Sequence, residues 1–275
     1  IGFMAYLRAR FFYGDLGLGF YPTVLVAAFS IFLCALYANP HRTGRALIAA
    51  AGAAGVALLT VIVATSRADW HSPAAWAPLF AGAVLTYVAA WYAERTAQDR
   101  KTDTSVTWWA GASAALVLLG VESAFGPEFR TLGHAAAALI FSIGFVWRGW
   151  RVAGWATLSA GALSIAQALS PALIGPTLDG TFPIWGGLLI FATVAVFLFS
   201  ASTIIRRGAT NISIAEGLSA ASVIVVLAGV FVALRWIAEG KVGVALDNFT
   251  EASLRVLALM AAGLTLLPRV HETPG

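Results

Sequence analysis

The sequence is dominated by nine long apolar runs, each closed by a turn that carries charges or is rich in Gly and Pro. Runs of about twenty apolar residues are long enough to cross the hydrocarbon core of a bilayer. A backbone in hydrocarbon must satisfy its own hydrogen bonds, so we expect every run to form a helix. The predicted spans are Gly17–Ala38, Ala46–Thr65, Ala74–Ala93, Ser105–Val121, Thr131–Trp147, Val152–Leu169, Pro183–Ile205, Ile212–Leu234 and Glu251–Leu267.

The composition agrees with a protein that is embedded in lipid. Hydrophobic residues make up 60% of the chain and charged residues 11%, whereas roughly a quarter of the residues of a soluble domain are charged. We therefore predict an all-α fold, a polytopic transmembrane bundle of about nine spans built as antiparallel hairpins. Residues 17–267 form this transmembrane domain, and residues 268–275 form a polar tail. Residues 1–16 form either an interfacial segment, which Arg8, Arg10 and the following aromatic residues favour, or the tail of a preceding span.

The basic residues predict the orientation of the chain. When successive turns are assigned to alternate sides of the membrane, ten Lys and Arg residues fall on one side and six on the other. Because short loops rich in Lys and Arg stay in the cytoplasm, we predict the N-terminus outside and the C-terminus inside a bacterial inner membrane. The net charge of +4 is spread over span ends and does not form the basic face that nucleic-acid binding requires.

Aromatic and small residues predict how the helices face lipid and one another. Most of the ten Trp residues lie at span ends, where they form an aromatic belt, while Trp155 lies inside a span and is expected to be a packed interior ring. The small residues of Ala49–Gly55 and the pair Gly154 and Gly161 predict close helix contacts. The Phe-rich faces, with Phe191, Phe197 and Phe199, are expected to meet lipid or a partner. The residues from Ser170 to Pro183 are interpreted as an outer connection.

Polar residues at membrane depth are candidate sites, because they are costly to bury there. Gln167, His134 and Glu216 each have a simple structural explanation. The densest group of charges surrounds the last outer loop, with Arg235, Glu239, Lys241, Asp247, Glu251 and Arg255. Glu251 and Arg255 are four residues apart and can pair on one face of a helix. This group either seats the ninth helix or forms an anion or headgroup site with Arg235, Glu251 and Arg255 as its residues.

Motifs for catalysis or cofactor binding are missing from the sequence. It contains no phosphate-binding glycine loop, nucleophile elbow or cluster with metal-ligand spacing. Haem ligation has little support, because His41, His71 and His271 lie in turns or the tail. Cys34 is the only cysteine, so an intrachain disulfide is impossible. We therefore predict no cofactor, no metal site and no catalytic residues, with the protein leaning away from being an enzyme.

The last third of the chain resembles a known family. The runs Pro183 to Arg207 and Ala215 to Arg235, then Gly240 and the stretch Thr250 to Leu259, are similar to a large bacterial family of predicted many-spanning inner-membrane proteins without an assigned activity. Arg235, Gly240 and Glu251 match that family's pattern, whereas Leu257 and Leu259 stand where it has aromatic residues. The resemblance implies a longer parent chain, in agreement with a sequence that starts at Ile1, and it supplies no catalytic residues.

Three functions remain open from the sequence. The first is a structural or accessory subunit of a larger membrane or envelope assembly, with the lipid bilayer and other protein chains, or further copies of itself, as partners. The second is a transporter or flippase for a lipid-linked or amphipathic substrate, with Arg235, Glu251 and Arg255 at its outer mouth. The third is an integral-membrane transferase that uses Glu122, Glu128 or Asp179 from outer loops.

Overall fold

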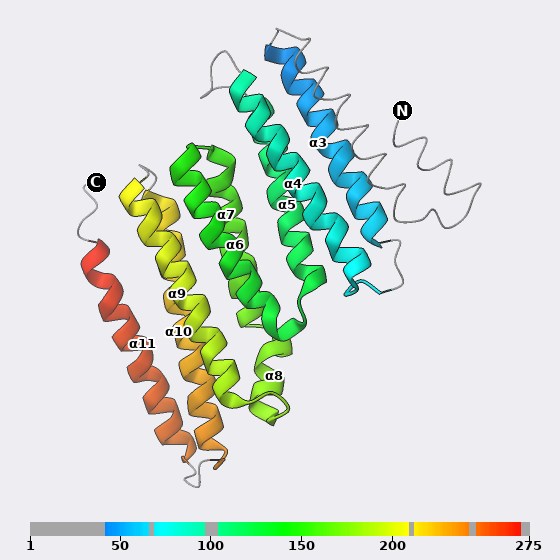
Figure 1. The fold of residues 1–275 in the computed structure, drawn as a ribbon. Helices are drawn as coiled ribbons and strands as arrows, with labels where there is room; N and C mark the ends of the chain where they lie inside the picture. Colours follow the sequence, from blue (N-terminus) through cyan, green and yellow to red (C-terminus); the bar gives the residue numbers. More distant parts are fainter. Residues whose placement is uncertain (1–41, 66–68, 97–103, 209–211, 242–245, 271–275) are drawn as a thin grey trace. The chain divides into compact units, whose positions relative to one another are not determined.

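The structure is a computed structural model that describes residues 42–65, 69–96, 104–208, 212–241 and 246–270. The predicted segment 1–16, the first predicted span Gly17–Ala38 and the end of the predicted polar tail lie outside the described residues. Every regular element in the described ranges is an α-helix (Figure 1). The helices are α3 (Arg42–Thr65), α4 (Pro73–Thr96), α5 (Thr104–Ala124), α6 (Pro127–Arg148), α7 (Arg151–Ala168), α8 (Pro171–Asp179), α9 (Ile184–Gly208), α10 (Ile212–Ala238) and α11 (Asn248–Val270).

Seven helical segments in the described ranges are long and apolar enough to cross a membrane. They are Gly44–Thr65, Pro73–Thr96, Thr104–Ala124, Pro127–Arg148, Arg151–Asp179, Ile184–Gly208 and Ile212–Ala238. The predicted all-α membrane fold is therefore confirmed. The count of nine spans and their arrangement as hairpins stay predictions, because α11 is not among these seven segments and the first predicted span lies outside the described residues.

The connection predicted from Ser170 to Pro183 contains a helix, α8, which the sequence analysis missed. Pro171 stands in its first turn, where the fixed φ of proline suits a helix and its missing N–H costs nothing. Gly180 adopts the left-handed conformation at φ 82° and ends the helix. The run was too short and too rich in proline to be recognised as a helix from its composition.

The described chain divides into two compact units. The first contains α3, α4, α5 and residues 148–156. The second contains residues 125–147, the part of α7 from residue 157 onward, and α8 to α11. The candidate site described below lies wholly within the second unit.

In the first unit, small residues bring α3, α4 and α5 together. Ala49 and Ala53 of α3 and Ala90 of α4 are buried in one cluster with Trp109 of α5. Small side chains allow helix backbones to approach closely in lipid, where burial of apolar area by itself gains little. The predicted close contact of Ala49–Gly55 is therefore confirmed for one side of α3.

In the second unit, α9 packs against α10, and one prediction about its aromatic residues is wrong. Phe191 was expected to face lipid or a partner, yet it is 2% exposed, because Gly229 of α10 leaves space for its side chain. Phe199 is 49% exposed, as predicted. Ser202 of α9 donates a hydrogen bond to the carbonyl of Ala215 of α10 over 2.6 Å, which adds a polar link between the two helices.

On α7, Trp155 contradicts the prediction of a packed interior ring. It is 70% exposed, while its neighbours Gly154 and Ala156 are buried. The small residues of α7 face its helix contacts: a Cβ at Gly161 would lie 3.0 Å from Leu218 of α10. Exposing an indole ring to water is unfavourable, whereas exposing it to lipid is not, so a Trp inside a span can point away from the bundle.

Candidate functional site

The site lies where α10 ends and α11 begins. Gly240, at φ 75°, follows the last turn of α10 and lets the chain reverse there. Asp247 then precedes α11: it accepts a hydrogen bond from the hydroxyl of Thr250, and its carbonyl accepts one from the N–H of Glu251 over 3.0 Å. The Thr250 bond, with the nearby backbone N–H groups, lowers the pKa of the Asp247 carboxyl. An ionised Asp at this position caps the helix and favours its start at Asn248.

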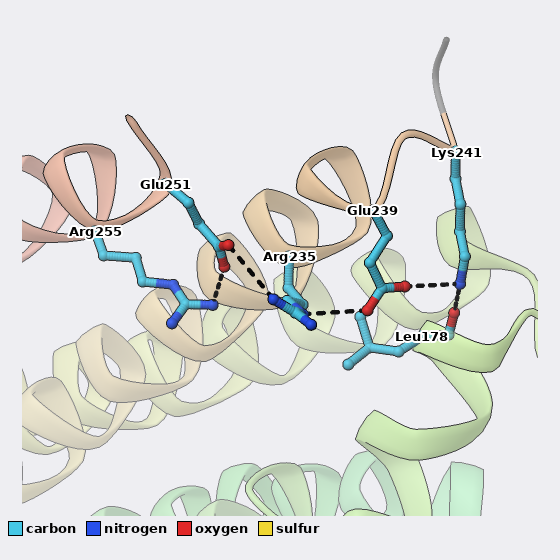
Figure 2. Close-up of polar contacts among 6 residues, drawn as sticks. All are labelled: Leu178, Arg235, Glu239, Lys241, Glu251 and Arg255. Carbon is cyan, nitrogen blue, oxygen red and sulfur yellow. Dashed lines mark hydrogen bonds and ion pairs between the residues drawn. The ribbon is translucent and has the colours of Figure 1, made fainter. Parts of the chain in front are cut away.

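Five charged side chains form a continuous chain of contacts across this junction, which we call the charged ladder: Lys241, Glu239, Arg235, Glu251 and Arg255 (Figure 2). Lys241 Nζ lies 3.1 Å from Glu239 Oε2, and Arg235 Nε donates to Glu239 Oε1 over 3.1 Å. Arg235 Nη1 lies 3.5 Å from Glu251 Oε2, and Arg255 Nη2 pairs with Glu251 Oε1. The charges alternate in sign from one end of the ladder to the other.

The ladder joins three helices. Lys241 also donates to the carbonyl of Leu178, at the end of α8, while Arg235 belongs to α10 and Glu251 to α11 (Figure 2). A hydrogen bond from Lys241, together with the positive charges of Lys241 and Arg235, lowers the pKa of Glu239, which lies just after α10. Glu239 is therefore ionised over a wide pH range and links Lys241 to Arg235 in the ladder.

Glu251 is the buried centre of the ladder. The residue is 5% exposed, whereas the side chains of Arg235 and Arg255 are 48% and 40% exposed. A carboxylate removed from water needs opposite charge and hydrogen bonds close by, since an unpaired buried charge is strongly destabilising. Arg255 of the same helix donates a hydrogen bond to Glu251, and Arg235 of α10 adds a second positive charge. Arg255 also places its guanidinium carbon 5.8 Å from the ring centroid of Phe231 on α10.

The structure brings together the three residues that the sequence analysis selected, Arg235, Glu251 and Arg255. It adds Glu239 and Lys241 to the same network, and it places Asp247 at the helix start instead. The role of Leu178 was not predicted, because it depends on α8. Pro171 and Gly180, at the two ends of α8, were the sequence features that could have predicted this helix.

A second polar contact, which the sequence analysis missed, lies in the first unit. Arg148 Nη1 lies 3.2 Å from Glu94 Oε2, and its guanidinium carbon is 5.9 Å from the ring centroid of Trp150. Arg45 of α3 is 8% exposed and donates to the hydroxyl of Thr96, on α4, over 3.0 Å. These arginines were interpreted only as markers of orientation, although they also connect helices.

The remaining candidates from the sequence are distributed over both units. Glu122 closes α5 in the first unit, while Glu128 and Asp179 belong to α6 and α8 of the second. His134 is buried, with Nδ1 at 3.0 Å from the carbonyl of Arg130 one turn earlier. Within the described ranges, no group of three or more His, Cys, Asp or Glu side chains is placed to hold a metal ion.

The apolar helical segments define the class of this protein: it is a multi-pass integral membrane protein. Comparison with protein family models, with curated proteins and with solved structures found no match for the chain. The resemblance of its last third to a bacterial membrane family therefore stays a prediction.

Proposed function

We propose that this protein is a structural or accessory subunit of a larger membrane or envelope assembly, in a bacterial inner membrane, with its N-terminus outside and its C-terminus in the cytoplasm. The observation that supports this most strongly is the position of Glu251, which is buried between arginines of two different helices. In transporters and pumps, charged groups at membrane depth line the path of the substrate. Here the buried charge fixes one helix against another.

The other polar contacts of the described helices support the same proposal. Arg45 and Thr96 join α3 to α4, Ser202 bonds to α10, and Ser164 of α7 donates to the carbonyl of Thr131 over 3.0 Å. Hydroxyl and guanidinium groups that bond across helices stabilise a defined bundle. A rigid bundle of this kind is suited to holding other chains in place.

A broad apolar surface is available on α11 for neighbours in the membrane. Its exposed apolar side chains are Val256, Leu257, Leu259, Met260 and Leu264. If α11 is the ninth predicted span, this surface meets lipid or the helix of another chain. A subunit at the edge of an assembly would present such a surface.

Extraction from the native membrane in a mild detergent tests the proposal. We would purify the protein through an affinity tag, measure the mass of the intact particle and identify every chain in it. A strain with the untagged protein is the control for chains that bind the affinity resin by themselves. Other chains present at a fixed ratio to this protein are the expected result. A particle that contains only this chain, as one copy or several, would contradict the accessory role.

The transport hypothesis is then tested separately with Arg255→Leu. If the variant inserts and keeps its particle mass but no longer moves an amphipathic substrate across vesicles, transport replaces the structural proposal. If the variant loses its partner chains or its membrane insertion instead, the ladder serves assembly, as we expect from the pairing of Arg255 with Glu251.

A further inference from the structure

The two ends of the charged ladder differ. At one end, Lys241 donates to the carbonyl of Leu178 and so closes the ladder against α8. At the other end, Arg255 pairs with Glu251 through Nη2, while its Nε is buried and has no hydrogen-bond partner within the described residues. The alternation of charges therefore stops at a cation whose side chain is 40% exposed.

The charge of the ladder also points to an anion. Its three basic and two acidic side chains leave one positive charge in excess. Asp247 carries a further negative charge nearby, but it bonds to Thr250 at the start of α11 and is not part of the ion pairs of the ladder. A single negative charge beside Arg255 would continue the alternation and neutralise the ladder.

The surroundings of Arg255 combine this charge with apolar surface. Its side chain is 40% exposed, and the next residues along α11, Val256, Leu259 and Met260, are 54%, 52% and 61% exposed. Leu259 lies one turn beyond Arg255 on the same side of the helix. A ligand that is anionic at one end and apolar along its length would match both features.

We propose that Arg255 binds the phosphate of an anionic phospholipid, whose acyl chain lies along the exposed face of α11. A guanidinium is suited to phosphate because it is planar, permanently charged and rich in donors. Arg255 lies near the start of α11, and its long side chain can extend toward the headgroup region. This binding is independent of the proposed structural role and would persist if the protein had no partner chains.

Lipid titration of the purified full-length protein tests the proposal. Phosphatidylglycerol is added to the protein in a neutral detergent, and bound lipid is counted by native mass spectrometry, with phosphatidylcholine as the zwitterionic comparison. We expect Arg255→Gln to weaken phosphatidylglycerol binding about tenfold, because a hydrogen bond to a charged group is lost. The control is Arg206→Gln, which removes the same charge from the exposed end of α9 and should leave this binding unchanged.

Glu251→Gln separates a binding role from a purely structural one. Removing the carboxylate takes away the ion-pair partner of Arg255, while Arg235 keeps its contact with Glu239. Phosphatidylglycerol binding should therefore stay the same or strengthen even if the protein becomes less stable. If Arg255→Gln alone fails to fold, the double variant Arg255→Gln/Glu251→Gln leaves no unpaired buried carboxylate and should fold without binding the lipid.

Three results would overturn the proposal. The first is equal loss of phosphatidylglycerol binding in Arg255→Gln and Arg206→Gln, which would indicate unspecific attraction to the whole protein. The second is a fall in binding with Glu251→Gln that matches the fall with Arg255→Gln. The third is equally tight binding of soluble glycerol phosphate, which would make the site one for a free phosphate ester and not for a lipid.

Discussion

At the level of single residues, Glu251 is a buried carboxylate that is paired with two arginines. Its carboxylate is 5% exposed and contacts Arg235 of α10 and Arg255 of its own helix. The contact with Arg255 is local, four residues apart, while the contact with Arg235 crosses between helices. Of the two ion pairs, only the second joins α11 to α10, although Arg255 also lies near the ring of Phe231 on α10.

A double-mutant cycle tests the contact between helices. Arg235→Gln and Glu251→Gln, alone and together, should show a coupling free energy of about 1 kcal/mol in unfolding, because an exposed arginine paired with a buried carboxylate lies between surface and buried ion pairs. Unfolding by a denaturing detergent in micelles measures it. If the losses in unfolding free energy of the two single variants add up to the loss in the double variant, the ion pair between Arg235 and Glu251 does not stabilise the packing of α11 on α10.

The carboxyls at this junction also predict a pH dependence. The pKa of Glu239 lies below its ordinary value of 4.5, chiefly because of the hydrogen bond from Lys241. A lowered pKa in the folded state stabilises the protein above pH 4.5, and this stabilisation is lost as the pH falls through the folded value. Unfolding midpoints measured as the pH is lowered should therefore fall less steeply for Glu239→Gln than for the unmodified protein. An identical slope for both would contradict the role of this carboxylate.

At the level of elements, glycine sets the distance between helices in the first unit. A Cβ at Gly82 of α4 would lie 2.7 Å from the Thr60 hydroxyl oxygen of α3 and 3.2 Å from Leu116 of α5. Thr60 has little freedom to move, since it is buried and donates to the carbonyl of Val56 over 2.7 Å. Three helices therefore meet where only glycine fits.

Gly82→Ala should destabilise the protein by about 1–3 kcal/mol, the usual cost of forcing a group into a packed core. The matched control is Gly55→Ala on α3, where a Cβ would meet nothing within 4 Å. Both changes replace glycine inside a helix, so the gain in helix propensity is the same. Detergent unfolding compares the two variants, and a loss of equal size in both would show that the close contact at Gly82 is not the cause.

The helices themselves could be predicted well from the sequence, because length and apolar character are local properties. The predicted span Ile212–Leu234, for example, begins at the first residue of α10 and ends four residues before its end. The side that each helix buries could not be predicted in the same way. Phe191 is buried because of Gly229, which is distant in the sequence, and Trp155 is exposed because the smaller residues beside it face the bundle.

The candidate site was predictable in part for the same physical reason. The pairing of Glu251 with Arg255 follows from helical spacing, and both were recognised as candidates. The end of the ladder at Leu178 depends on a short helix with two prolines, and the contact between Arg148 and Glu94 joins residues 54 positions apart. Contacts of this kind require the packing of the helices, which hydropathy does not specify.

At the level of the whole molecule, we expect the helices to cross the membrane and to carry their charges near their ends. Within the second unit, Arg206 and Arg207 lie in the last turn of α9, shortly before α10 begins, while the charged ladder lies where α10 ends. Since α10 is one of the seven segments long and apolar enough to span, we expect these two groups of charges on opposite faces of the bilayer.

Labelling of cysteines from each side of the membrane tests this topology of α10 most directly. In a Cys34→Ala background, which removes the only native cysteine, a cysteine is introduced either by Phe249→Cys or by Arg207→Cys, both at exposed positions. A maleimide that cannot cross membranes should label the Phe249→Cys protein in intact cells and the Arg207→Cys protein only after the inner membrane is opened. The reversed pattern would contradict the predicted orientation, and labelling of both from the same side would contradict the claim that α10 spans the membrane.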